Sequence, residues 1–251
     1  MAIIKFNNPP LVEVALGVEL EDTNFSSVHL GLYWQEIRDR FPEWAERPPV
    51  IMRSNDDDDF LPPLRRISFI SSDTKKLVQL QDNFFGYNWR YKNSRDYPHF
   101  ENLFQGFLQE WNYLQGWWSK VGESPLKPSR YELTYANLID KNSGWNNSGD
   151  HQKIFRFVSS NWNDFLKTPD YHDIQLIYSL PNDEGRLIVE VDQRLTEGDD
   201  SSIVIFQLTA VSFDASKSLV DWFRDTHSYI IKAFLSLTEK EAQDKWGRYD
   251  T

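Results

Sequence analysis

Two segments of the chain place hydrophobic residues three and four positions apart, which is the period of an amphipathic helix. In residues 100–118 the apolar positions are Phe100, Leu103, Phe104, Phe107, Leu108, Trp111, Leu114 and Trp118. In residues 219–237 they are Leu219, Trp222, Phe223, Ile230, Phe234 and Leu237. We expect two long helices, each with one apolar stripe buried against a sheet.

Alternating polar and apolar residues predict a β-hairpin in the first half of the chain. Residues 76–81 and 84–91 flank Asp82-Asn83, a short loop that accepts the positive φ angles of a tight turn. Pairing about this loop places one set of side chains on an apolar face: Val78, Leu80, Phe85, Tyr87 and Trp89. The opposite, mostly polar face carries Gln79, Gln81, Phe84, Asn88 and Arg90. Such a sheet packs a helix on one side only.

The same patterns predict strands at residues 12–20, 67–71, 131–139, 174–180, 187–195 and 203–213. Shorter helices are expected at residues 28–41 and 151–165. In the first of these helices, Leu32, Trp34, Ile37 and Phe41 are the expected apolar positions.

The two halves of the chain share an order of motifs. Residues 9–14 (PPLVEV) match residues 128–133 (PSRYEL) at an offset of 119, with proline and glutamate four positions apart in both. The same offset carries residues 103–104 onto 222–223. We interpret this as a duplicated β-α-β-β-β-α unit, with halves at residues 1–124 and 125–251 packed as one compact unit. The alternative is chance, because proline before a strand and a final amphipathic helix are common.

The predicted fold class is α+β, with antiparallel curved sheet and long helices packed on one face. Because the helices cover only one face, we expect the concave polar face of the sheet, or a groove between the halves, to stay uncovered. The pattern resembles the TATA-binding-protein-like and gyrase-inhibitor-like duplicated architectures, a resemblance that transfers no function.

Charge and composition limit the function. Among 251 residues, 27 are Lys or Arg and 38 are Asp or Glu, a net charge of −11, so generic nucleic-acid binding is not expected. An acidic surface keeps a protein soluble and would also suit a basic partner. There is no cysteine for disulfides or thiolate sites. Without a secretory signal or an apolar run long enough for a membrane span, we expect a cytoplasmic protein.

The common catalytic signatures are missing, including phosphate-binding glycine loops, the Gly-x-Ser-x-Gly elbow and His-Glu-x-x-His. We therefore predict no catalytic residue, no cofactor and no metal site. Asp170, Glu190 and Asp192 resemble a metal-dependent nuclease pattern, but Asp192 stands where that pattern needs lysine. The alternative is the polar face of a hairpin. The acidic run at residues 55–59 is expected to be a solvated loop, and His227 a hydrogen-bonded core or interface histidine rather than a catalytic base.

One polar surface is a candidate for recognising a carboxylate, a phosphate or backbone amides. Asn88 and Arg90 lie on one side of a predicted strand, with Gln79 and Gln81 across the ladder. The predicted binding residues are Gln79, Gln81, Asn88, Trp89, Arg90, Glu13 and Glu132. A solvated sheet face or a hydrogen-bond network between the halves would explain the same pattern.

Several short motifs together resemble a sporadically distributed bacterial family of proteins about 250 residues long. They are residues 9–14 (PPLVEV), 47–49 (RPP), 77–81 (LVQLQ), 88–90 (NWR), 97–98 (YP), 233–234 (AF), 237–238 (LT) and 246–248 (WGR). The resemblance spans nearly the whole chain and implies no activity and no catalytic residue. Patchy occurrence of this kind is typical of genes for defence or toxin-neutralising systems.

The leading hypothesis is a non-catalytic binding protein that acts through a protein partner, in a bacterial defence or toxin-antitoxin-like system. Aromatic residues are numerous, with 10 Trp, 11 Tyr and 17 Phe, and they supply contact area at interfaces when exposed. The alternatives are a small-molecule or nucleotide sensor with a ligand between the halves, and a metal-dependent hydrolase or nuclease. A homodimer and a monomer are both compatible with the sequence.

Overall fold

The computed structural model of the protein describes residues 4–23, 25–47, 65–91, 97–121, 124–158, 169–195 and 202–250. The first half contains β2 (Leu11–Glu21), α1 (Ser27–Ile37), β3 (Glu43–Arg47), β4 (Arg66–Ile70), β5 (Lys76–Gln81), β6 (Phe84–Arg90) and α2 (Phe100–Trp118). The second half contains β7 (Lys127–Ile139), α3 (His151–Ile154), β8 (Asp173–Ser179), β9 (Gly185–Leu195), β10 (Ser202–Ser212) and α4 (Leu219–Leu237). Further short elements are β1 (Ile4–Phe6), α5 (Lys240–Lys245), β11 (Arg248–Asp250) and three 3-10 turns at Lys141–Ser143, Ser148–Asp150 and Pro181–Asp183.

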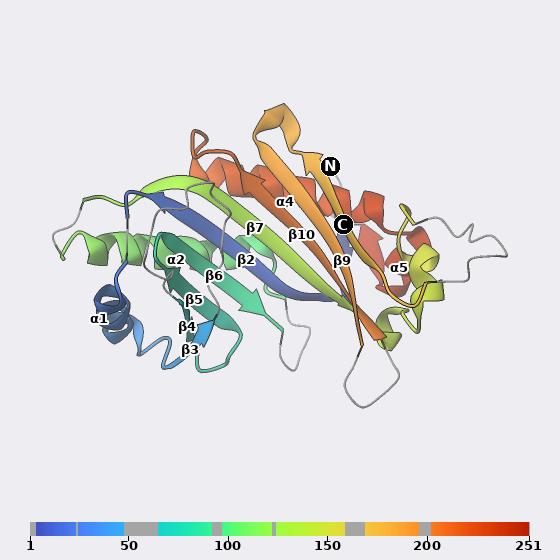
Figure 1. The fold of residues 1–251 in the computed structure, drawn as a ribbon, viewed down its shortest axis with the longest axis horizontal. Coiled ribbons are helices and arrows are strands. Elements are labelled where there is room, and N and C mark those ends of the chain that lie inside the picture. The colour runs from blue at the N-terminus through green and yellow to red at the C-terminus, as the bar shows by residue number, and fades with distance from the viewer. Residues whose placement is uncertain are drawn as a thin grey trace.

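One curved antiparallel sheet runs through both halves, so the predicted α+β class is confirmed. Nine strands of the described residues pair in the order β3–β4–β5–β6–β2–β7–β10–β9–β8 (Figure 1). Strands β2 and β7 lie at the centre and join the halves through a long antiparallel ladder. Strand β1 pairs separately with β11, which places the two described ends of the chain side by side.

The strand order is the same in both halves when counted outward from the centre. β2 is followed by β6, β5 and β4, and β7 by β10, β9 and β8. Ala15 pairs with Thr134, the residue 119 positions later, so a local two-fold axis passes through this pair. Helices α2 and α4 also begin 119 positions apart. The arrangement is what a repeated unit predicts, while its origin by gene duplication stays a prediction.

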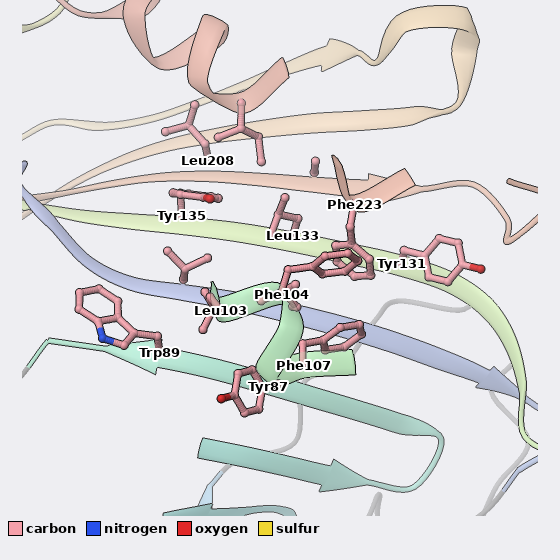
Figure 2. Close-up of a cluster of buried hydrophobic side chains, with 14 of the residues drawn as sticks. Tyr87, Trp89, Leu103, Phe104, Phe107, Tyr131, Leu133, Tyr135, Leu208 and Phe223 are labelled. Carbon is pink, nitrogen blue, oxygen red and sulfur yellow. The ribbon is translucent and has the colours of Figure 1, made fainter. Parts of the chain in front are cut away.

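Helices α2 and α4 cover one face of the sheet and contact each other through aromatic rings (Figure 1). The Phe223 ring of α4 lies 5.7 Å from Phe104 and 5.1 Å from Phe107, both on α2, measured between centroids. Tyr131 of β7 lies 5.9 Å from the same ring. Figure 2 shows these side chains converging from the sheet and both helices. This cluster is the core shared by the two halves.

A glycine lets α2 approach the sheet closely. A Cβ atom at Gly106 would lie 2.5 Å from the Tyr87 hydroxyl of β6, and real Cβ atoms do not come so near. The side chain of Tyr87 is itself buried. The small residue therefore sets the distance between helix and strand at this crossing.

Some predicted elements differ from the structure. Ile37 and Phe41 are buried as predicted, whereas Leu32 is 45% exposed because α1 buries Leu30 and Tyr33 in its place. The helix expected at residues 151–165 ends at Ile154, where Phe155 turns extended and bridges to Thr238. Strand β3 is an addition to the predicted unit. The acidic run at residues 55–59 lies outside the described residues.

Substituting Phe223 tests whether the aromatic cluster holds the halves together. Because the ring is fully buried, Phe223→Ala should lower the free energy of unfolding by about 3–5 kcal/mol. Urea denaturation followed by circular dichroism and tryptophan fluorescence measures the change. Val28→Ala on the exposed side of α1 is the control, expected to stay within about 0.5 kcal/mol of wild type. Two separate unfolding transitions in the wild type would contradict one shared core.

Candidate functional site

The face of the sheet opposite α2 and α4 carries most of the predicted binding residues. Glu13 of β2 accepts a hydrogen bond from the side-chain amide of Asn88 on β6. Gln79 of β5 accepts one from the Arg66 guanidinium of β4 over 3.1 Å. Glu13 also pairs across the ladder with Arg90, whose Nε donates to the Thr74 carbonyl over 3.5 Å.

The first half closes this face, which corrects the expectation of an open polar hollow there. Gln79, Gln81 and Asn88 are only 5–7% exposed. Trp89 points to the opposite face, where it is buried and lies 5.2 Å from the Tyr97 ring. Roles for these residues in binding stay predictions, and the polar groups of Asn88 and Gln79 are already occupied by their neighbours.

On the same face, one ion pair joins the halves between β2 and β7, and a second polar contact links β7 to β10 within the second half. Glu19 of β2 forms an ion pair with Arg130 of β7. The hydroxyl groups of Thr134 on β7 and Thr209 on β10 lie 3.1 Å apart, with either able to donate. The sequence alternative of a hydrogen-bond network between the halves therefore describes this part of the face.

Burial shifts the pKa of the Glu132 carboxyl group in this network. Removal of its carboxyl group from water raises the pKa, although the Thr134 hydroxyl donates to it over 3.4 Å and the charges of Arg66 and Arg130 oppose the shift. The pair of glutamates predicted from the sequence thus differs in environment. Glu13 accepts a hydrogen bond from the Asn88 amide, whereas burial removes the Glu132 carboxylate from water and disfavours its charged form.

The second half leaves its polar face open. Glu190 of β9 accepts a hydrogen bond from Gln175 of β8 at 3.2 Å and one from Gln207 of β10 at 3.1 Å. These three side chains form one polar rung across three strands. Gln175 is exposed and the other two are half-buried. Beside this rung, the Ile177 side chain of β8 is 61% exposed.

We call this surface the open half-face and define it by Gln175, Ile177, Ile188, Glu190, Asp192 and Gln207. All six lie on the face opposite α4, because the alternate residues of the same strands are buried in the core on β9 and β10 or packed against it at Ile174 and Leu176 on β8. At its margin, the Arg186 guanidinium lies 4.6 Å from the centre of the exposed Phe213 ring. Apolar and charged groups thus alternate over the surface.

Carboxylates dominate one end of the open half-face. Asp173 of β8 pairs directly across the ladder with Asp192 of β9, an unfavourable juxtaposition of like charges. Asp192 accepts a hydrogen bond from the Tyr171 hydroxyl at 3.1 Å. It also forms an ion pair with Arg194 at 2.7 Å. Asp173 has no comparable cation in the described part of the chain.

The nuclease pattern of the sequence does not assemble as a metal site among the described residues. Glu190 is held by two amides, and Asp192 by Tyr171 and Arg194. No group of three or more His, Cys, Asp or Glu side chains in these ranges is placed to hold a metal ion.

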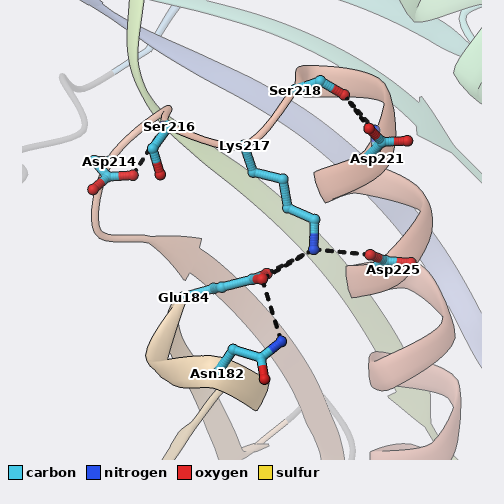
Figure 3. Close-up of polar contacts among 8 residues, drawn as sticks. All are labelled: Asn182, Glu184, Asp214, Ser216, Lys217, Ser218, Asp221 and Asp225. Atoms are coloured by element: carbon cyan, nitrogen blue, oxygen red, sulfur yellow. Dashed lines mark hydrogen bonds and ion pairs between the residues drawn. The ribbon is translucent and has the colours of Figure 1, made fainter.

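The turn that leads from β8 to β9 is tied to α4. Lys217 donates to Glu184 at 2.9 Å and to Asp225 at 2.8 Å (Figure 3). Hydrogen bonding to Asp225 and Glu184 raises the pKa of Lys217. Ser218 caps α4 by accepting the amide hydrogen of Asp221 at 3.2 Å. These contacts fix the end of the sheet that carries the open half-face.

His227 is the hydrogen-bonded interface histidine that the sequence predicts. Its Nδ1 lies 2.8 Å from the Tyr135 hydroxyl, and its ring stacks on Phe100 with 4.0 Å between centroids. Burial lowers the pKa of His227 to about 4. The imidazole therefore joins α4 to β7 and to α2 in its neutral form.

The sequence analysis does not predict a pair of buried histidines elsewhere in the second half. The His151 and His172 rings lie 3.7 Å apart between centroids, and both side chains are buried. Burial and the neighbouring ring lower the pKa of His151 to about 4. Their separation of 21 positions carries no signal that sequence inspection could use.

Comparison of the chain with protein-family models, with curated proteins and with solved structures found no match. Among the described residues, every helix is too short or too polar to cross a membrane. The evidence for function therefore comes from the geometry of the chain itself.

The sequence analysis missed the open half-face although a signal was present. Gln175 and Glu190 are polar residues with apolar residues on both sides in sequence, which is the pattern that predicts the polar face of the β5–β6 hairpin. The sequence alternative for Glu190 and Asp192, the polar face of a hairpin, places both residues correctly but does not identify that face as a binding surface. The exposure of Ile177 could not be inferred, because it depends on β8 being the outermost strand.

Replacing the desolvated carboxyl group of Glu132 should change how stability varies with pH. A carboxyl group whose pKa is raised on folding contributes stability at low pH and loses it as pH rises through the folded-state pKa. Relative to wild type, Glu132→Gln should therefore become more stable as the pH is raised from about 4, near the ordinary pKa of glutamate, to neutral. Urea denaturation across this range measures it, with the exposed Glu43→Gln as control. A constant difference between variant and wild type would contradict the assignment.

Acid should weaken the protein through His227. Its depressed pKa means that the unfolded chain takes up the proton first, so stability falls as pH drops from about 6.5 to about 4. His227→Gln retains a hydrogen-bond acceptor without this titration and should show a shallower loss. His99→Asn is the control, since His99 is exposed. Equal slopes for wild type and His227→Gln would refute the prediction.

Proposed function

We propose that the chain is a non-catalytic binding protein that acts through a protein partner. The observation that carries the proposal is the open half-face, where exposed apolar side chains stand among charged and amide groups. Ile177, Phe213 and Tyr171 are each about half exposed or more. Apolar side chains gathered within a polar rim are typical of protein interaction sites.

The difference between the halves favours the second half as the interacting one. Strands β6 and β10 are equivalent about the local two-fold axis, and Asn88 of β6 is buried while Gln207, 119 positions later on β10, is half-buried. A small ligand held by Asn88 is less favoured, because Glu13 already occupies its amide.

The proposed setting is the bacterial cytoplasm, in a defence or toxin-antitoxin-like system. It rests on the resemblance to a sporadically distributed family and on the absence of cysteine from the sequence. The net charge of −11 suits a basic partner.

Affinity purification from cells of the organism that encodes the protein tests the proposal. The wild-type chain should recover one partner in stoichiometric amount. Ile177→Asp should abolish the recovery, because it buries a carboxylate against the partner's apolar contact. Val28→Asp, a matched change of an exposed apolar residue on α1, should recover the partner as wild type does. Repeated isolation of the chain alone would count against the proposal.

A further inference from the structure

The outer edge of β8 exposes backbone groups that can pair with another strand. In an antiparallel ladder, every second residue directs its N–H and C=O groups toward the neighbour. The Gln193 amide donates to the His172 carbonyl at 3.1 Å, and the Leu180 amide to the Gly185 carbonyl at 3.0 Å. The even-numbered residues of β8 therefore bond to β9.

The odd-numbered residues of β8, which include Asp173, Gln175 and Ile177, consequently direct their backbone groups outward. Ser179 supports this alternation, because its carbonyl accepts the Tyr229 hydroxyl of α4 at 3.2 Å instead of a β9 amide. Among the described residues, β8 is the last strand on this side of the sheet and no other strand pairs with its outer edge.

The edge lacks three of the features that prevent strand addition. Proteins protect such edges with proline, with lysine or with a β-bulge. β8 contains none of these residues, and it pairs with β9 in continuous register over seven positions. Gln175 and Ile177 are exposed along it, which leaves the outward amides accessible.

Charge identifies the kind of strand that fits. Residues 173–195 contain five acidic and two basic side chains, and one of the basic ones, Arg194, is bound to Asp192. A lysine or arginine next to Asp173 would relieve its repulsion with Asp192. A second copy of the same edge would instead bring two acidic surfaces together.

From these observations we infer that the outer edge of β8 binds an extended, basic segment of the partner protein as a further antiparallel or parallel strand. Lysine or arginine side chains of that segment lie beside Asp173 and Asp192, and apolar ones lie beside Ile177. Backbone hydrogen bonds supply affinity and the alternating side chains supply specificity, as in other strand additions. This inference rests on the proposed function and names its binding mode.

A proline substitution tests the backbone contribution. Gln175→Pro removes one outward amide hydrogen and leaves the ladder to β9 intact, whereas Gln175→Ala removes the same side chain and keeps the amide. The probe is a fluorescein-labelled heptapeptide that alternates lysine with valine, followed by fluorescence anisotropy. Loss of one hydrogen bond should weaken binding to Gln175→Pro about five- to tenfold relative to Gln175→Ala. Equal affinities would overturn strand addition.

The charge contribution is tested with matched reagents. A heptapeptide that alternates glutamate with valine should bind wild type at least about tenfold more weakly than the lysine peptide. Asp173→Lys, which leaves the backbone unchanged, should weaken the lysine peptide and strengthen the glutamate peptide. Absence of lysine-peptide binding, or equal binding of both peptides, would overturn the inference.

Purification of the natural partner separates failure of this inference from failure of the proposed function. If wild type and Gln175→Pro recover the partner equally while Ile177→Asp loses it, the open half-face binds a protein without strand addition. If wild type recovers no partner, the proposed function itself fails. If wild type forms a dimer and Gln175→Pro is monomeric, the occupant of the β8 edge is a second copy of the chain. That result would overturn the inference of a basic partner segment.

Discussion

The long antiparallel ladder between β2 and β7 is the interaction on which the rest of the structure depends. It runs from Leu11 to Glu21 on one strand and fixes the register of both halves around the Ala15–Thr134 pair. Because each strand brings its own neighbours, this one ladder makes a single sheet from two sets of strands. It also brings α2 and α4 close enough for the contacts of Phe223 with Phe104 and Phe107.

Local periodicity was enough to predict the elements whose burial pattern repeats along the chain. The two long helices are predicted from apolar stripes that run from Phe100 to Trp118 and from Leu219 to Leu237, and the structure has a helix over each stripe. Strand β3, with the sequence EWAER, carries no such pattern and exists through its pairing with β4. Of the apolar positions predicted in and just after α1, Ile37 and Phe41 are buried, but Leu32 faces solvent.

The candidate site was harder to predict, since polarity alone does not distinguish an open surface from an internal network. Asn88 and Gln79 were correctly placed on the polar face, but their burial depends on what covers the first half. Gln175 and Glu190 follow the same alternation and lie on the surface that stays open. Exposure is a long-range property, and the order of strands decides it.

The central position of β2 has a consequence for synthesis of the chain. Its partner β7 begins at Lys127, more than a hundred residues after β2 ends at Glu21. At ~5–20 residues per second, the ribosome takes roughly 5–20 s to make the intervening chain. Throughout that interval the nascent strand, with Val14, Leu16 and Val18, has one side without its neighbour. Chaperones that shield emerging apolar strands therefore have a defined window in which to act on this protein.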